Sequence, residues 1–345
     1  MLWSRRVADA EESARRDLSR RLRKLERLFH IDPLRTEQLG PAQVAAYYAE
    51  CHAAYRKHHS AEGAAHMALN VGGRFDPEGF AEHLRRIQAR WTAAPPREVL
   101  EIGFGQGYNL AWLAPRHPGV QFHGIDLTQA HLQVASARVR AAGLGNVRLR
   151  HGDFHQIPLP DASVDEVYAI EAFCYARDVP QALAEVARVL RPGGRFTLFD
   201  GYQPRPSAQL DADGALAVEL VARGTALQRW QVPDELVAQA QAAGFTAEPV
   251  QRLDDEVMPN LRRLERLVGA LIRWPWLARR ALASRPVARS RNVLSGYLLH
   301  RTVSMGLLCY AQIVLHKAGA MPDPSTPTTL DAVMPDLAMP IQARA

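Results

Sequence analysis

The stretch VLEIGFGQGYN at residues 99–109 decides the fold. An apolar run leads directly into Gly103, Gly105 and Gly107, and a helical stretch follows at 108–114. Glycine is needed where a chain turns sharply and its backbone approaches a ligand with no Cβ in the way. The stretch therefore predicts a strand, a glycine-rich turn and a helix at one wall of a ligand site. A dinucleotide fingerprint would place its third glycine at 108, where Tyr108 stands.

Strands and helices alternate downstream of this turn. Further apolar runs predict strands at VQFHGID, NVRLRHGD, VDEVYAIEAF and RFTLFDGY, with helices at 108–114, 128–142 and 180–190. Two late strands are predicted at 245–250 (FTAEPV) and 307–315 (LLCYAQIVL). This βαβ alternation predicts a doubly wound α/β fold, with a parallel sheet that helices cover on both faces.

Acidic side chains follow the second and third strands. Asp126 ends the second strand, where a carboxylate can accept hydrogen bonds from both hydroxyls of a ribose. Asp153 follows the third strand and could accept from the exocyclic amine of an adenine, with Phe154 as an apolar wall. The carboxyl ends of parallel strands share one sheet edge, so the sequence predicts a nucleoside site there.

These motifs resemble those of class I S-adenosylmethionine (SAM) methyltransferases. LEIGFGQG resembles the family's glycine motif, GIDLT its ribose acid, GDF its adenine motif, and LRPGGRFTLFD the motif around its fifth strand. The resemblance implies SAM as cofactor and a seven-stranded Rossmann-like sheet with an antiparallel last strand. It places Glu101 near the methionine moiety. The implied cofactor-binding residues are Glu101, Gly103, Phe104, Gly105, Gly107, Asn109, Asp126, Leu127, Asp153, Phe154 and Glu171.

The run after the fourth strand bears on the methyl acceptor. IEAFCYA resembles the IEATCHA run of sterol C-methyltransferases, with Phe173 for Thr and Tyr175 for His, whereas the Pro-Pro run of DNA-base methyltransferases is missing. The resemblance implies a small apolar, isoprenoid-like acceptor that is methylated at carbon through a carbocation. Such chemistry needs aromatic faces for the cation and one base. We expect Glu171 to act as that base or to stabilise the cation, and the candidate catalytic residues are Glu171, Tyr55, His58, His59 and Tyr175.

Two alternatives stay open at this point. The chain could methylate oxygen or nitrogen of a polar secondary metabolite, with the same residues deprotonating or positioning a heteroatom. It could also be a SAM-binding partner protein without catalysis. The acceptor, the methylated atom and the oligomeric state are not determined by the residues. The histidines at 52, 58, 59 and 66 lack a standard metal spacing, so we expect no metal.

The net charge of +6 is unevenly distributed. Residues 1–30 carry nine basic and five acidic residues, and residues 258–301 carry ten arginines and one glutamate, which leaves −7 for the remainder. An acidic body suits a cationic cofactor and argues against nucleic acid as the partner. The basic segment contains LRRLERLVGALIRWPWLARRAL (261–282), for which three roles compete: a plain lid, a helix that dips into a lipid surface, and a clamp for a diphosphate.

The predicted organisation has seven parts. These are a basic amphipathic helix (1–40), a helical cap (41–94), the SAM-binding core (95–204), the remainder of the core (205–257), a helical lid insertion (258–304), the last strand (305–318) and a disordered tail (319–345). No stretch reaches the ~18–20 apolar residues of a membrane span, and three widely spaced cysteines fit a reducing compartment. We therefore expect a cytoplasmic protein, with peripheral membrane contact through 1–30 and 258–301 left open.

Overall fold

The computed structural model describes residues 2–29, 31–91, 95–283 and 287–319. The α-helices are α1 (Leu2–Leu28), α2 (Ile31–Thr36), α3 (Pro41–His58), α4 (Glu82–Gln88), α5 (Tyr108–Leu113), α6 (Gln129–Ala141), α7 (Val179–Val189), α8 (Ala212–Gly224), α9 (Pro233–Ala242), α10 (Asp254–Leu271), α11 (Pro275–Ala283) and α12 (Val287–Ser304). The strands are β1 (Glu98–Ile102), β2 (Gln121–Asp126), β3 (Val147–His151), β4 (Val164–Ile170), β5 (Leu190–Tyr202), β6 (Phe245–Ala247), β7 (Gln251–Arg252) and β8 (Cys309–Lys317). The predicted tail lies outside the described residues from 320 onward.

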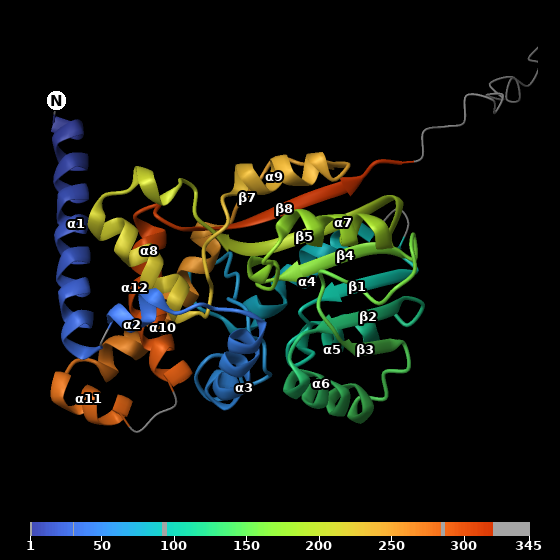
Figure 1. The fold of residues 1–345 in the computed structure, drawn as a ribbon, viewed down its shortest axis with the longest axis horizontal. Helices are drawn as coiled ribbons and strands as arrows, with labels where there is room; N and C mark the ends of the chain where they lie inside the picture. Colours follow the sequence, from blue (N-terminus) through green and yellow to red (C-terminus); the bar gives the residue numbers. More distant parts are fainter. Residues whose placement is uncertain (1, 30, 92–94, 284–286, 320–345) are drawn as a thin grey trace, which may run out of the picture.

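The strands form one mixed sheet in the order β3-β2-β1-β4-β5-β8-β6 (Figure 1). The first five pair in parallel, and β8 runs antiparallel to β5 from Arg195↔His316 to Tyr202↔Cys309. The predicted α/β class and the antiparallel last strand are confirmed. The described residues hold one strand more than predicted, because Gln251 and Arg252 form a short edge strand, β7, on β8.

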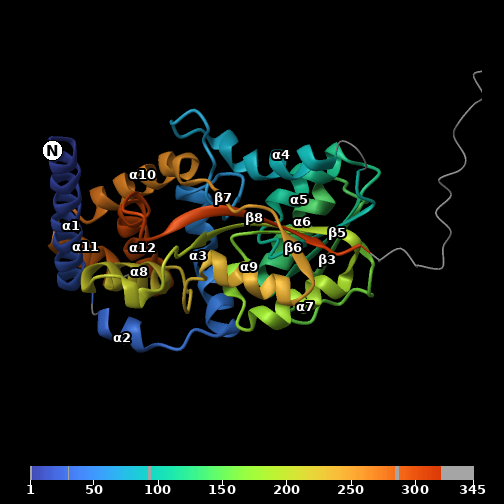
Figure 2. The same cartoon turned by 90° about the horizontal axis from the view of Figure 1, so that it is seen from above.

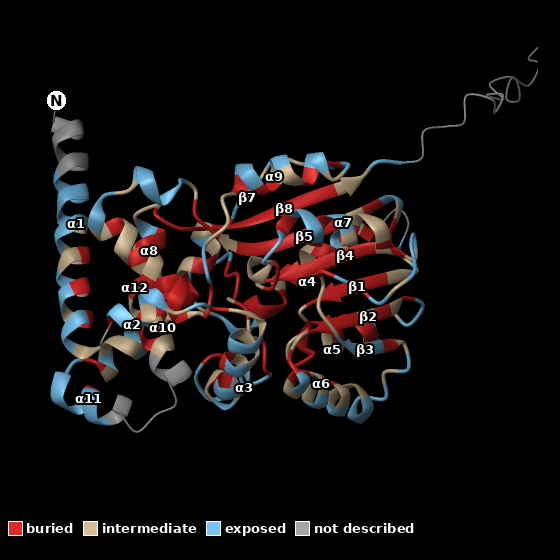
Figure 3. Ribbon diagram, viewed as in Figure 1, coloured by how far each residue is buried: buried red, intermediate tan, exposed pale blue. Residues whose placement is uncertain are grey.

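The two faces of the sheet bury separate cores, because side chains alternate along a strand. On β5, Leu198 packs with α7 and α9, while its neighbour Phe199 packs on the opposite side with residues of α4. Figure 2 shows α4, α5 and α6 over one face and α7 and α9 over the other. The central strands β1, β2, β4, β5 and β8 are buried along most of their length (Figure 3). The sheet is therefore doubly wound, as the alternating pattern predicted.

A helical layer of α1, α2, α8, α10, α11 and α12 lies beyond the carboxyl ends of the parallel strands (Figure 1). On α1, Leu18, Leu22 and Leu25 are almost fully buried against this layer, so the predicted apolar stripe of this basic helix faces the protein body. α10 and α12 pack against each other, and α12 packs on α8. No helix among the described residues combines the length and the apolarity that a membrane crossing needs. The domain boundaries stay a prediction.

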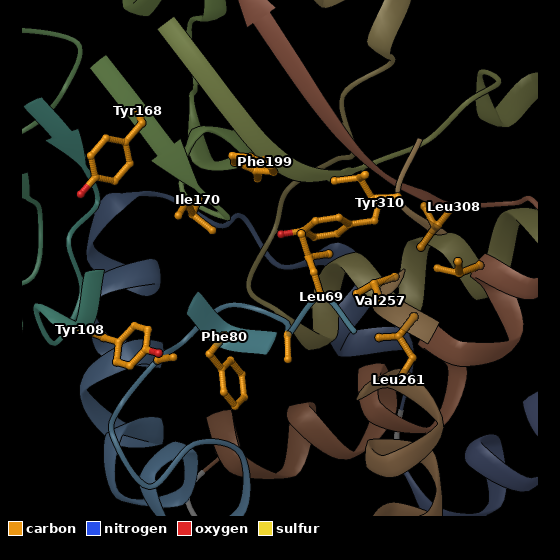
Figure 4. Close-up of a cluster of buried hydrophobic side chains, with 14 of the residues drawn as sticks. Leu69, Phe80, Tyr108, Tyr168, Ile170, Phe199, Val257, Leu261, Leu308 and Tyr310 are labelled. Carbon is orange, nitrogen blue, oxygen red and sulfur yellow. The ribbon is translucent and has the colours of Figure 1, made fainter. Parts of the chain in front are cut away.

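The segment between α3 and α4 has little regular structure and packs against the helical layer and the sheet. Leu69 lies beside Tyr310 of β8 and Val257 of α10 (Figure 4). Its backbone is anchored by hydrogen bonds from Leu69 N–H to the Gly79 carbonyl (3.0 Å) and from Asn70 N–H to the Glu256 carbonyl (2.7 Å). This anchoring holds residues 63–67 at the carboxyl edge of the sheet, where they become one wall of a cavity.

Candidate cofactor and active site

A cavity of about 260 Å³ opens at the carboxyl ends of β1, β2 and β4. Its floor comes from the turns that follow these strands, and its outer wall comes from residues 39–48, 63–66 and 226–229. Of the residues predicted to bind cofactor or to act in catalysis, it is lined by Gly103, Phe104, Gly105, Asn109, Asp126, Leu127, Asp153, Phe154, Glu171 and Tyr175. The strand-end motifs therefore meet around one hollow.

The glycine-rich turn takes backbone conformations that other residues rarely adopt. Gly103, Gly105 and Gly107 have φ angles of +71°, +52° and +74°. A Cβ on Gly103 would lie 2.4 Å from the Ala172 Cβ, and one on Gly107 would lie 2.9 Å from the Ala135 Cβ. Gly107 is the residue before α5 and is not among the cavity-lining residues. Its role is to let α5 pack closely on α6.

The Asp126 carboxylate is fixed by three donors. Its Oδ2 accepts from the Gly105 N–H (2.8 Å) and its Oδ1 from the Thr128 N–H (2.8 Å). His131 Nδ1 lies 3.2 Å from Oδ1. Asp126 is only 8% exposed, and that exposed part lines the cavity. The second strand end is thus tied to the glycine turn, and the carboxylate orientation is set before any ligand binds.

Asp153 and Phe154 form the far end of the cavity. Asp153 accepts from the His155 backbone N–H (2.9 Å) and from the Arg177 guanidinium (2.7 Å). Burial alone would raise the pKa of Asp153, but the hydrogen bonds from His155 and the charge of Arg177 lower it overall. Phe154 stacks on Phe173 at 5.7 Å between ring centroids. This end therefore offers an ionised carboxylate beside an aromatic wall.

Glu101 lies behind the cavity and is not among the lining residues. Its oxygens accept from the Asn109 side-chain amide (2.6 Å) and from the Tyr168 hydroxyl (3.1 Å). Burial raises the pKa of Glu101 to about 8. Asn109 Oδ1 is in turn 3.0 Å from His66 Nε2, and both Asn109 and His66 line the cavity. Any influence of Glu101 on a ligand passes through Asn109.

Glu171 stands at the end of β4 in the left-handed region, with φ +50°. A side chain other than glycine is strained there, and two hydrogen bonds hold it: its N–H donates to the Phe199 carbonyl (2.8 Å), and its Oε1 accepts from the Met67 N–H (2.6 Å). Burial, with the nearby Asp200 charge, raises the pKa of Glu171 to about 8, against the opposing hydrogen bonds from Met67 and Tyr310. The result is a half-buried carboxyl group in the cavity wall.

Two tyrosines complete the wall opposite the glycine turn. Tyr175 donates from its hydroxyl to the Thr225 carbonyl (2.7 Å), so Tyr48 donates to the Tyr175 hydroxyl (3.0 Å). Both line the cavity, and their rings meet edge to face at 5.8 Å. Because the Tyr175 hydroxyl already donates its hydrogen bond to a carbonyl, Tyr175 offers a ligand its ring and not a free O–H donor.

Three predicted catalytic residues lie away from the cavity-lining set. Tyr55 bonds to the Tyr47 hydroxyl (3.2 Å), His58 is exposed at the end of α3, and His59 is buried with Nε2 2.8 Å from the His66 carbonyl. Burial lowers the pKa of His59 to about 4. α3 runs unbroken to His58, and of its tyrosines Tyr48 is the one that lines the cavity. None of the three lines the cavity, although Tyr55 stays near Glu171: burial, and to a smaller extent the Glu171 charge, raises the pKa of Tyr55.

Several cavity residues have no counterpart among the predicted ones. His66 comes from the segment before the core, Thr128 and His131 follow the predicted ribose motif, and Gln106 lies within the glycine motif. Gln106 could have been predicted, because it lies inside the glycine motif that located the site. His66 could not have been predicted, because its segment shows no periodic pattern in the sequence.

The helical insertion is the predicted lid. Among the described residues of 258–304, none lines the cavity, and the covering wall is supplied by 39–48, 63–66 and 226–229. α12 instead supports α3 from behind, through the Asn292 side chain, which bonds Tyr47 and Cys51. The insertion packs on α8 and α1 as well as on α3, and its predicted role as a lid stays a prediction.

The buried carboxyls predict how stability depends on pH. Burial raises the pKa of three carboxyls in the folded chain, to about 8 for Glu101 and Glu171 and to about 7 for Asp200. As the pH rises, these groups ionise in the unfolded chain while they are still protonated in the folded one. Each then lowers the free energy of unfolding by about 1.4 kcal/mol per pH unit up to its folded pKa. Burial lowers the pKa of His59, His66 and His83 below 6.5. These histidines make the free energy of unfolding rise with pH, but only up to about pH 6.5.

We therefore expect the ligand-free protein to lose stability between pH 6.5 and 8. Urea unfolding at several pH values measures this, and Glu101→Gln should make the decline shallower because one of the three carboxyls is removed. An exposed-site replacement, Asp161→Asn, serves as control. A free energy of unfolding that rises across this window would contradict the assignment of protonated carboxyls.

Comparisons with known proteins agree with this geometry. A family model described as "Methyltransferase domain" matches residues 100–198. The chain is 30% identical over 211 residues to "24-methylenesterol C-methyltransferase 2" of Oryza sativa subsp. japonica, covering 61% of this chain and 57% of the relative. It is 30% identical over 187 residues to "O-methyltransferase resE" of Aspergillus sclerotiorum, covering 53% of this chain and 67% of that protein. The chain thus spans little more than half of the first relative's length.

Solved structures share the fold at low identity. The [4+2]-cyclase SpnF superposes with a TM-score of 0.64 at 19% identity, over 81% of this chain and 97% of that one. A geranyl diphosphate C-methyltransferase from Streptomyces coelicolor A3(2) superposes with a TM-score of 0.56 at 15% identity, over 79% and 98% of the respective chains. At these identities the likeness extends to the fold.

Proposed function

Because this chain belongs to the S-adenosylmethionine-dependent methyltransferase family, we propose that it methylates carbon in a small apolar, isoprenoid-like acceptor, with Glu171 as the base. The observation that carries the proposal is the half-buried Glu171 carboxyl, which lines the cavity and whose pKa is raised to about 8. Perturbed carboxyls of this kind in a cleft are candidates for acid–base work.

The residues of the cavity fit the cofactor. Gly105 has open space where a Cβ would stand, so a ligand can approach its backbone. Gln106 is 3% exposed, and its Oε1 has no hydrogen-bond partner among the described residues, which leaves a buried acceptor for a cationic amine. Asp126, Asp153 and Glu171 add acidic groups around the same space. Such a donor and acceptor set suits a ligand that carries an ammonium and a sulfonium.

The chemistry divides between cofactor and protein. SAM, when bound, would supply an electrophilic methyl group. The π electrons of an alkene acceptor would form the new C–C bond, the S–CH₃ electrons would remain on sulfur, and a cation would remain on the adjacent acceptor carbon. Glu171 then takes a proton from a neighbouring carbon, and the electrons of that C–H bond form the new double bond. The rings of Tyr48 and Tyr175 offer negative faces to the cation, worth about 0.5–2 kcal/mol each. Glu171 must be ionised to act.

The cavity favours an uncharged acceptor. The outer wall contains Leu39, Pro41, Val44, Ala226 and Leu227. The arginines that line the cavity are Arg177, which is paired with Asp153, and Arg229, which is exposed at the rim. Proteins bind phosphate groups mainly through arginine, lysine or a metal ion, and the arginines of the insertion do not line this space. We therefore place the acceptor among apolar molecules without a phosphate group.

Oxygen is the second candidate for the methylated atom. Among the relatives, the O-methyltransferase of Aspergillus sclerotiorum is covered to two thirds of its length. Glu171 could deprotonate a phenol or enol with the same geometry, since a base near pKa 8 matches such a donor. A tyrosine-lined wall accepts an aromatic acceptor as well as an alkene.

Methyl-labelled SAM separates these possibilities. We expect label to enter an apolar lipid extract and not a polar metabolite extract, with the product carrying a C–CH₃ group by nuclear magnetic resonance. Label in an O–CH₃ group would favour the second candidate. Tight binding of S-adenosylhomocysteine with no transfer into either extract would overturn methyl transfer and leave a SAM-binding protein.

A further inference from the structure

The face of the helical layer that carries α11 does not contribute to the cavity, and it has an unusual composition. Trp274, Trp276 and Leu277 are 56%, 66% and 44% exposed. Large apolar side chains seldom gather on a solvent-facing surface unless it binds something. We name this surface, formed by Leu267, Arg273, Trp274, Trp276, Leu277 and Arg280, the tryptophan face.

Packing on one side of α11 leaves these residues outside. Ala278 is fully buried with Ile272 and Val293, so α11 is anchored through a small residue. Arg279 donates to the Arg27 carbonyl at the end of α1 (3.0 Å), which ties the helix to α1 from the side. The tryptophans gain no burial from this arrangement. They are held outward by a docked helix and not by a free loop.

The exposed charged side chains of the segment that carries this face, 258–283, are all arginines. Arg262, Arg266, Arg273 and Arg280 are exposed. Residues 258–301 contain one acidic residue, Glu265, and its carboxylate is turned inward to Arg21 and His300. Arginines around exposed tryptophans are typical of helices that lie in the headgroup region of a bilayer, with the aromatic rings at the acyl boundary.

We propose that the tryptophan face docks on an anionic lipid surface. The arginines contact lipid phosphates, and the indole rings insert beside them, because each indole has an apolar body and a polar N–H that suits the interface. The proposal goes beyond the methyl-transfer reaction and does not depend on it. It also assigns a role to the basic segment 258–301, of which no described residue lines the cavity.

Vesicle co-sedimentation of the full chain tests the proposal. We expect sedimentation with vesicles of phosphatidylcholine and phosphatidylglycerol in equal parts, weak sedimentation with phosphatidylcholine alone, and release by salt. The double variant Trp274→Ser/Trp276→Ser should bind at least about tenfold more weakly. Arg273→Gln/Arg280→Gln should lose about fivefold per charge on anionic vesicles only.

Val71→Ser is the matched control, because Val71 is 73% exposed but lies on the segment between α3 and α4. It should bind vesicles like the parent chain. Thermal unfolding of every variant checks that the fold is retained, since these side chains are exposed. Equal vesicle binding by the tryptophan variant and the parent would overturn the proposal. So would a dimer of the parent that the tryptophan replacement converts to a monomer, because the face would then meet a second copy.

Discussion

Replacing Glu171 with glutamine should slow methyl transfer by about 10²–10⁴-fold, the usual contribution of a positioned base. Glutamine has nearly the same size, and its amide oxygen can still accept the Met67 N–H that now reaches Glu171 Oε1 at 2.6 Å. The strained backbone at this position therefore keeps its support. What the variant loses is the capacity to take a proton.

Initial rates with labelled SAM measure this effect, and calorimetric titration with S-adenosylhomocysteine measures cofactor binding, which should change little. Glu78→Gln, at a carboxylate that is 77% exposed beside Arg85, is the matched control and should leave both quantities unaltered. Full activity in Glu171→Gln would remove this residue from the mechanism. Lost activity together with lost cofactor affinity would reduce its role to positioning the cofactor.

The same carboxyl sets the pH dependence of the parent chain. Only the ionised form accepts a proton, so kcat/KM should rise about tenfold per pH unit and level off near pH 8, where the raised pKa of free Glu171 lies. The sign follows from burial, which favours the neutral acid at lower pH.

Replacing Asp126 with asparagine should weaken cofactor binding by about 10²–10³-fold. The carboxylate accepts from the Gly105 and Thr128 N–H groups, one on each oxygen, and hydrogen bonds to a charged group contribute about 1.5–3 kcal/mol each. The asparagine NH₂ would face one of these donors, so a buried N–H loses its acceptor and the glycine turn is released. The expected contact to the ribose hydroxyls is weakened as well.

The dissociation constant of S-adenosylhomocysteine measures this loss, and Asp161→Asn at an exposed turn is the control. We expect the turnover at saturating cofactor to fall less than the affinity, because Asp126 is not next to the reacting atoms in the proposed arrangement. Unchanged affinity would show that this carboxylate only organises the turn. A thermal unfolding curve separates a loss of affinity from a loss of the fold, because a misfolded variant shows no cooperative transition.

The sequence by itself determined the core and the part of the cavity that the strand ends form. The strand–turn–helix at 99–109 and the acids Asp126 and Asp153 are local features: each lies where an apolar strand ends, and parallel strands end at one edge of a sheet. Local pattern plus that one topological rule is enough to bring them together. The position of Glu171 followed in the same way from the end of β4.

The tertiary structure alone decided the acceptor side. Tyr55 follows Tyr48 by about two turns of α3. The two rings lie 6.5 Å apart between centroids, yet Tyr48 lines the cavity while the Tyr55 hydroxyl bonds to Tyr47. Nothing in the sequence showed where the cavity stands along this helix. His66 lies in a segment that is held by partners distant in the sequence, among them the Glu256 carbonyl and the Glu171 carboxylate. The tryptophan face points outward because the insertion packs on α8 and α1. Long-range packing, which leaves no period in the sequence, set all three.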